Sequence, residues 1–126
     1  CLSRGLGDVY KRQVPGLSEN IKVRSVMGRF LEHPRVFYFY NDGDDELFLS
    51  SADWMPRNFF ARMETCFPIE SPDLKARILE ESFDLYMNDN TGAWELQPDG
   101  CYMRIKRHPN AKPRNAQQAL IERLAK

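Results

Sequence analysis

The sequence predicts an α/β chain of the α+β kind, with a mixed sheet flanked by helices. Two apolar runs, residues 36–40 and 47–49, enclose an acidic turn at 41–46, which is the pattern of a β-hairpin. Residues 71–87 have the spacing of an amphipathic helix. These stretches place a strand-rich segment before a helix, followed by a second short hairpin and a last helix.

The segments around the first hairpin are predicted to be strands. Residues 21–27 alternate between apolar and polar side chains, which is the period of a half-buried strand. Residues 36–40 consist of valine and aromatic residues, which suits a strand covered on both faces. Residues 62–69 form a further strand candidate that Pro68 interrupts. The acidic turn lacks the ligand positions of an EF-hand loop, so we expect no Ca²⁺ there.

Helix and turn signals organise the second half of the chain. Ser71 suits an N-cap and Pro72 a first helical position, so a helix is expected to begin there and to cover the sheet. Residues 93–96 and 102–106 flank a turn that contains Asp-Gly, which predicts a second hairpin. Asn115 is expected to cap the last helix.

The first residues of the chain stand apart from the rest. Residues 3–13 (SRGLGDVYKRQ) back-translate without mismatch to the end of a common transposase-based sequencing adapter. We therefore interpret residues 1–13 as a non-native segment and residues 14–126 as the domain proper. The alternative is a genuine polar N-terminal segment. Without residues 1–13 the chain holds 15 basic and 17 acidic residues, a net charge of −2, which argues against a general nucleic-acid binder.

The charge is unevenly distributed along the chain. Residues 64–99 hold nine acidic and two basic side chains, and residues 104–126 hold seven basic and one acidic. A basic tail can bind a polyanion, and the alternative is a solvated surface helix.

Cysteine usage and hydropathy indicate a cytoplasmic protein. Cys1, Cys66 and Cys101 form neither a disulfide framework nor a metal-ligand spacing, which suits a reducing compartment. No apolar run approaches the roughly 18 residues that a transmembrane helix needs.

A histidine and an arginine before the first hairpin are the main candidates for chemistry. His33 is one of two histidines, and a lone histidine is more often structural than catalytic. Arg35 lies two residues on, so both side chains project to the same side of a strand. An imidazole beside a guanidinium is unfavourable unless an anion bridges them, and a phosphate pairs well with the guanidinium fork. The pair therefore predicts a phosphate site.

Polar residues after the hairpin extend this candidate site. Ser50 and Ser51 offer hydroxyl and backbone N–H groups, and Asp53 is placed to orient a histidine ring N–H. Arg57 and Arg62 are candidates for further phosphate contacts, and the alternative for both is a surface arginine paired with a carboxylate.

The segments GRFLEHPR and SSADWMPRN, with VPGLSENIKVRSVMGRFLEH leading into them, resemble the C-terminal catalytic domain of bacterial polyphosphate kinases of the phosphohistidine type. The resemblance covers residues 14–126 and implies a phospholipase-D-like fold. The run 33–35 stands where that superfamily has its second His-x-Lys motif, and residues 50–53 stand where it has a Gly-Ser-x-Asn turn. Arg35 replaces the superfamily's lysine, as it does in the kinases, which disfavours a phospholipase or nuclease.

The resemblance implies reversible transfer of the ATP γ-phosphate to inorganic polyphosphate through a phosphohistidine. The phosphorylated histidine and the Mg²⁺ ligands would lie upstream, so residues 14–126 are expected to be truncated at the N-terminal side and inactive alone. His33 would act as a catalytic residue that binds the nucleotide phosphates and protonates the leaving oxygen. Arg35, Ser50, Ser51, Arg57 and Arg62 would bind further phosphates.

The same resemblance implies a cytoplasmic homo-oligomer as the full-length enzyme, with membrane association as an alternative location and no nucleic-acid partner. Two other functions stay open. One is a phospholipase-D-like phosphodiesterase, and the other is a non-catalytic polyanion-binding module that uses Arg57, Arg62 and the basic tail.

Overall fold

The computed structural model describes residues 16–17 and 19–125, so the predicted non-native segment 1–13 lies outside the described residues. The chain divides into two compact units. The central unit is Leu31–Asp84, and the terminal unit combines Cys1–Phe30 with Leu85–Lys126. Within the described residues, no helix has the length and apolar character that crossing a bilayer requires.

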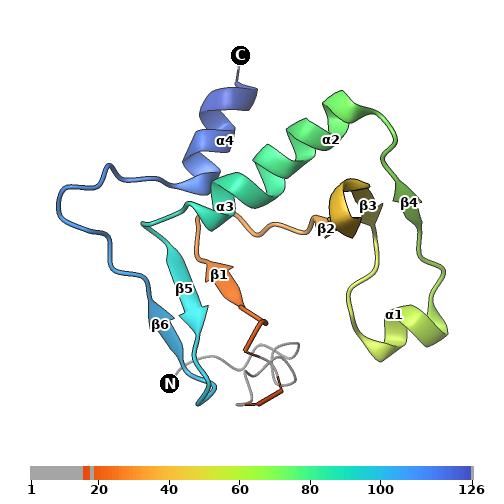
Figure 1. The fold of residues 1–126 in the computed structure, drawn as a ribbon, viewed down its shortest axis with the longest axis horizontal. Helices are drawn as coiled ribbons and strands as arrows, with labels where there is room; N and C mark the ends of the chain where they lie inside the picture. Colours follow the sequence, from red (N-terminus) through yellow and green to blue (C-terminus); the bar gives the residue numbers. More distant parts are fainter. Residues whose placement is uncertain (1–15, 18, 126) are drawn as a thin grey trace. The chain divides into compact units, whose positions relative to one another are not determined.

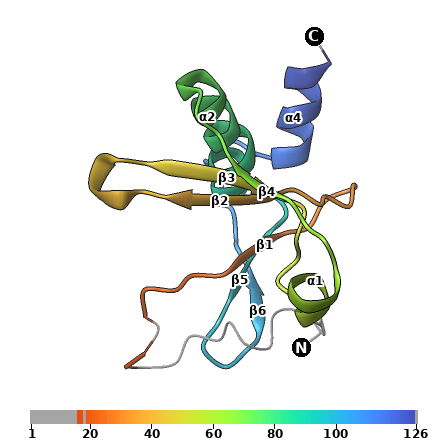
Figure 2. The same cartoon turned by 90° about the vertical axis from the view of Figure 1, so that its right-hand side faces the viewer.

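The central unit is built on the predicted hairpin. Its three-stranded antiparallel sheet has the order β2-β3-β4, and Figure 2 shows these strands side by side. The strands are β2 (Arg35–Phe39), β3 (Glu46–Ser50) and β4 (Cys66–Pro68). The turn η1 (Asn41–Gly43) closes the hairpin with positive φ at all three of its residues, which suits its Asn-Asp-Gly sequence. Leu47, on the central strand, is the most buried apolar residue of this unit.

Helices complete the central unit. The short helix α1 (Pro56–Ala61) was not predicted from the sequence, and it begins at a proline in the first turn. Helix α2 (Pro72–Leu79) follows Ser71 as predicted, although the Ser71 side chain makes no capping hydrogen bond. The π-helical segment η2 (Glu80–Asp84) continues α2. The Phe83 ring lies 6.3 Å from the Tyr38 ring of β2, so this helix covers the sheet as predicted.

The terminal unit holds the second predicted hairpin. Its antiparallel sheet has the order β1-β5-β6, visible in Figure 1. The elements are β1 (Arg24–Val26), α3 (Leu85–Met87), β5 (Ala93–Leu96), β6 (Tyr102–Arg104) and α4 (Ala116–Leu124). Asn115 caps α4 by accepting a hydrogen bond from the Gln118 N–H at 2.9 Å, which confirms the predicted cap. Ala93, Leu96 and Ala116 form the buried core.

The strands differ from the prediction in three respects. The expectation that residues 36–40 are covered on both faces is wrong, because Phe39 and Tyr40 are 51% and 66% exposed. The strand expected over residues 62–69 is limited to Cys66–Pro68. One mixed sheet was predicted, whereas the described strands form two sheets in which all pairings are antiparallel. The α+β class itself is as predicted.

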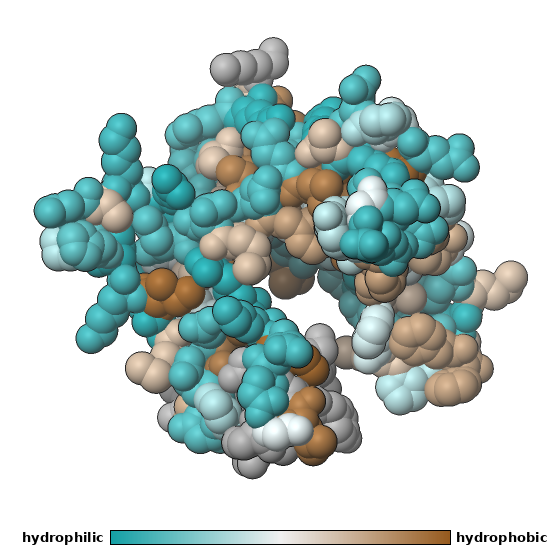
Figure 3. Space-filling view, viewed as in Figure 1, coloured by the Kyte–Doolittle hydropathy of each residue, from teal (hydrophilic) through white to brown (hydrophobic). Residues whose placement is uncertain are grey.

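The surface of the central unit is apolar around α1. Four large side chains in and beside this helix are more than half exposed: Trp54, Phe59, Phe60 and Met63. Figure 3 shows tan, hydrophobic surface in the region where Figure 1 places α1.

Candidate active site

The structure brings His33, Arg35 and Asp53 together. His33 precedes β2, Arg35 begins it, and Asp53 lies in the turn after β3. The Arg35 Nε donates a hydrogen bond to Asp53 Oδ1 at 2.8 Å, and the Nη2 contacts the same oxygen. The Arg35 guanidinium also lies against the His33 ring, with Nη2 2.7 Å from Nε2. One guanidinium therefore touches both an imidazole and a carboxylate.

The charge of Asp53 is set by its neighbours. The hydrogen bond from Arg35 has the largest effect and lowers the pKa of Asp53. Burial raises this pKa by less than that hydrogen bond lowers it, and the charges of Arg35, His33 and Arg57 each lower it further. The Arg35 side chain is 14% exposed, whereas the His33 side chain is 68% exposed. An ionised carboxylate thus holds the arginine in place and leaves the imidazole facing solvent.

Asp53 does not hydrogen-bond to the imidazole in this conformation. The His33 Nε2 lies 3.9 Å from Asp53 Oδ2, beyond hydrogen-bond distance. Arg35 instead contacts the ring, and its Nη1 donates to the His33 carbonyl at 2.5 Å. The orienting contact on the ring comes from the guanidinium.

The serine turn is tied to the segment before β4. The Ser50 hydroxyl donates to the Thr65 carbonyl and accepts from the Ala52 N–H, both at 3.1 Å. The Ser51 hydroxyl donates to a Glu64 carboxylate oxygen at 2.5 Å and accepts from the Thr65 N–H at 3.0 Å. Both hydroxyls therefore shape the turn next to Arg35, which is the cross-strand neighbour of Ser50.

A hollow of about 330 Å³ lies beside this turn in the central unit. Ser50 and Arg62 line it, together with the stacked rings of Phe37 and Trp54, whose centroids are 6.0 Å apart. Phe37 lies two residues after Arg35 on β2, so the two share a face of the sheet. His33 and Arg35 do not line the hollow. Arg57 is exposed, and its charge acts on Asp53.

Asn58 is a site residue that sequence reasoning missed. It is buried in α1 and lines the hollow, and its amide Nδ2 donates to the Asp53 carbonyl at 3.1 Å. Its Oδ1 is buried with no partner among the described residues. The available signal was a polar residue two positions after Pro56, which begins α1, and five positions after Asp53.

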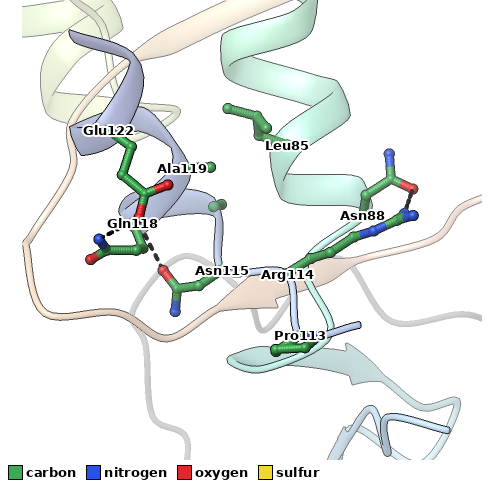
Figure 4. Close-up of a pocket in the computed structure, with 9 residues that line it drawn as sticks. Leu85, Asn88, Pro113, Arg114, Asn115, Gln118, Ala119 and Glu122 are labelled. Carbon is green, nitrogen blue, oxygen red and sulfur yellow. Dashed lines mark hydrogen bonds between the residues drawn. The ribbon is translucent and has the colours of Figure 1, made fainter. Parts of the chain in front are cut away.

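A second hollow, of about 410 Å³, lies in the terminal unit between α3 and α4 (Figure 4). Its polar side chains bond to one another: Arg114 to Asn88 at 3.5 Å, and Gln118 to Glu122 at 2.8 Å. We assign no phosphate to this hollow, because its polar groups are already paired within the protein.

Within residues 16–17 and 19–125, no three His, Cys, Asp or Glu side chains are grouped so that they could hold a metal ion.

Sequence comparison identifies the family. A family model described as "Polyphosphate kinase C-terminal domain 2" matches residues 4–117. The chain belongs to the polyphosphate kinase family. This polyphosphate kinase domain is 54% identical over 112 residues to "Polyphosphate kinase" of Pseudomonas aeruginosa PAO1, a match covering 89% of this chain and 16% of that one. It is 59% identical over 91 residues to "Polyphosphate kinase" of Neisseria meningitidis serogroup B, covering 72% and 13%.

The fold comparison agrees with the sequence comparison. The crystal structure of the polyphosphate kinase from Porphyromonas gingivalis matches with a TM-score of 0.78 and 34% identity, over 86% of this chain and 16% of that chain. The predicted class, α+β of the phospholipase-D-like fold, is confirmed. The polyphosphate kinase domain spans about one-sixth of the length of such relatives.

Proposed function

We propose that this domain serves the reversible transfer of the ATP γ-phosphate to inorganic polyphosphate, by binding phosphates while a histidine elsewhere in the enzyme carries the phosphoryl group. The observation that carries the proposal is the contact of the Arg35 guanidinium with both His33 and Asp53. Family membership and the names of the relatives support the choice of ATP and polyphosphate as substrates. The proposed enzyme is a cytoplasmic homo-oligomer.

The geometry suits a site that receives a phosphate. Asp53 holds Arg35 before any ligand arrives, so the guanidinium loses little conformational freedom on binding. His33 is the more exposed partner, so a phosphate group that binds Arg35 can also reach the imidazole. As the bond between the γ-phosphorus and the bridging oxygen breaks, His33 gives its proton to that oxygen on the ADP side.

Other cations of the central unit extend the site. Arg57 and Arg62 are exposed and make no ion pair within the described residues, so both are available to further phosphate groups. Ser50 borders the hollow that Arg62 lines, and Ser51 anchors the turn. Mg²⁺ would accompany ATP and reduce the repulsion between phosphates, with its protein ligands outside this domain.

A chimeric enzyme tests the proposal. The matched segment of the Pseudomonas aeruginosa kinase is replaced by this chain, and polyphosphate synthesis from ATP is measured. We expect the chimera to be active and His33→Ala to reduce synthesis by about 100-fold or more, since general acid catalysis contributes on that scale.

Leu31→Ala is the matched control, because Leu31 is 95% exposed and lies two residues before His33. It should leave synthesis unchanged, and circular dichroism should show that both variants are folded. Normal turnover by His33→Ala would refute the proposed role. Phosphodiester hydrolysis without polyphosphate synthesis would instead support the phosphodiesterase alternative.

A further inference from the structure

The terminal unit carries a segment, residues 104–114, that we call the cationic loop. It begins at the last residue of β6 and ends before α4. No acidic residue occurs between positions 100 and 121. The loop carries five cationic side chains, all of them on exposed residues: Arg104, Lys106, Arg107, Lys112 and Arg114.

None of these five cations forms an ion pair with a carboxylate of the described residues. The arginines of the loop donate instead to neutral oxygens: Arg104 to the Thr91 carbonyl at 2.8 Å, Arg107 to the Ala111 carbonyl, and Arg114 to the Asn88 amide at 3.5 Å. The positive charge of the loop is therefore not neutralised within the described protein.

Three carboxylates of the same unit accept hydrogen bonds from groups outside the loop. The buried Asp89 accepts hydrogen bonds from the Thr91, Gly92 and Ala116 N–H groups, each at 2.8 Å. Asp99 accepts from the Cys101 N–H at 2.8 Å, and Glu122 accepts from Gln118 at 2.8 Å. None of the three forms an ion pair with the cationic loop.

The backbone of the loop is held at three points. The Ile105 N–H donates to the Ala93 carbonyl at 2.9 Å, and the Ala111 N–H closes a turn on the His108 carbonyl at 2.9 Å. Asn90 fixes the far side by donating to the Lys112 carbonyl at 3.0 Å and accepting from the Arg114 N–H at 2.8 Å. Because the backbone of the loop is already ordered, the loop loses less conformational entropy when a ligand binds.

We propose that the cationic loop is a second binding site for inorganic polyphosphate, which contacts the chain away from its reacting end. The choice of polyphosphate rests on the proposed function, whereas the site itself rests on the unpaired charges. Residues 103–114 contain no Phe, Tyr or Trp, so the loop offers no aromatic platform for the bases of a single-stranded nucleic acid. A linear inorganic polyanion needs only the cations. The loop holds the growing chain between successive transfers.

The test uses the full 126-residue chain and fluorescently labelled long-chain inorganic polyphosphate. The double variant Lys106→Gln/Lys112→Gln removes two exposed ammonium groups that form no hydrogen bond or ion pair with the described residues, so we expect its fold to be retained. We expect its dissociation constant for polyphosphate to rise about tenfold. We also expect the plot of log affinity against log salt concentration to become shallower by about one to two released counterions, on the order of one for each lost phosphate contact.

The control Lys22→Gln/Arg29→Gln removes the same charge from exposed residues of the same unit, and its affinity should stay within about twofold of the unaltered chain. Binding is measured here without ATP and without turnover, whereas the chimera assay measures polyphosphate synthesis, so a failure of the catalytic proposal is separable from a failure of this one. An equal loss in the control variant would overturn the loop site. Equal affinity for single-stranded DNA would overturn the choice of polyphosphate.

Discussion

Two aspartates show how partners decide the role of a residue. Asp53 is exposed enough to join a ligand site, and Arg35 holds it there. Asp89 is only 1% exposed and joins the start of α4 to the segment before β5. Burial is the largest single influence on Asp89 and raises its pKa, but the hydrogen bonds from Gly92, Ala116 and Thr91 together outweigh it and lower the pKa. Asp89 is therefore ionised and structural.

Asp89→Asn should destabilise the chain by roughly 2–4 kcal/mol at neutral pH, because an amide cannot accept all the hydrogen bonds that the carboxylate accepts. The folded-state pKa of Asp89 lies below the ordinary value of 3.8, so its contribution is present above about pH 3.8 and is lost as the pH falls through the folded value. Urea denaturation at a series of pH values should show the difference from the unaltered chain shrinking on acidification.

Asp99→Asn is the control for Asp89, since this exposed carboxylate accepts a single backbone hydrogen bond. We expect a loss below about 1 kcal/mol. A difference between the unaltered chain and Asp89→Asn that grows below pH 4 would contradict the assignment.

The His33 and Arg35 pair was the part of the site that residue-level reasoning could reach. Two residues on one side of an extended segment must be close, and the structure places their side chains in contact. Asn58 could not be reached in this way, because its burial depends on a helix, α1, whose short length leaves little periodic signal.

At the level of elements, two glycines allow close packing in the terminal unit. The Met27 N–H donates to the Gly92 carbonyl at 2.8 Å, and a Cβ at Gly92 would overlap the Met27 carbonyl. A Cβ at Gly28 would overlap the side-chain amide of Gln117. That amide bridges the Phe30 N–H at 3.0 Å and the Phe30 carbonyl at 2.7 Å, so it ties α4 to the segment after β1.

Gly92→Ala should destabilise the chain by roughly 2–4 kcal/mol and Gly28→Ala by roughly 1–2 kcal/mol. The larger loss is expected at Gly92 because the Met27 backbone there can move aside less easily than the Gln117 side chain at Gly28. Thermal denaturation followed by circular dichroism measures both. Gln117→Ala removes the overlapping amide, so the double variant Gly28→Ala/Gln117→Ala should be more stable than the sum of its single effects by about 0.5 kcal/mol or more.

A second double-mutant cycle, which combines Gly92→Ala with Gln117→Ala, supplies the control, since a Cβ at Gly92 would overlap Met27 and not Gln117. These two effects should add. Additive behaviour in the Gly28 cycle would show that Gln117 does not limit the space at that position.

At the scale of the whole molecule, the chain divides its proposed tasks between two units. The central unit holds the His33 and Arg35 pair, and the terminal unit holds the cationic loop. The match spans 16% of the Pseudomonas aeruginosa kinase, which is consistent with a phosphorylated histidine elsewhere in such an enzyme.

The chain by itself should therefore take up no phosphate from ATP. Incubation with ATP labelled at the γ-phosphate, followed by mass spectrometry or autoradiography, should leave it unlabelled, while the Pseudomonas aeruginosa kinase treated in parallel serves as the positive control. A labelled phosphohistidine at His33 would show that the proposed roles of the histidines are wrong.

The sequence by itself determined the two hairpins, the helix after Ser71, the Asn115 cap and the family, because these depend on short-range periodicity, turn residues and contiguous motifs. Only the tertiary structure decided that Asp53 pairs with Arg35, that the serine hydroxyls bind the segment at 64–65, and that Asp89 is buried. These contacts join residues 13 to 27 positions apart. Their pairing follows from strand register and helix packing, which local patterns leave unspecified.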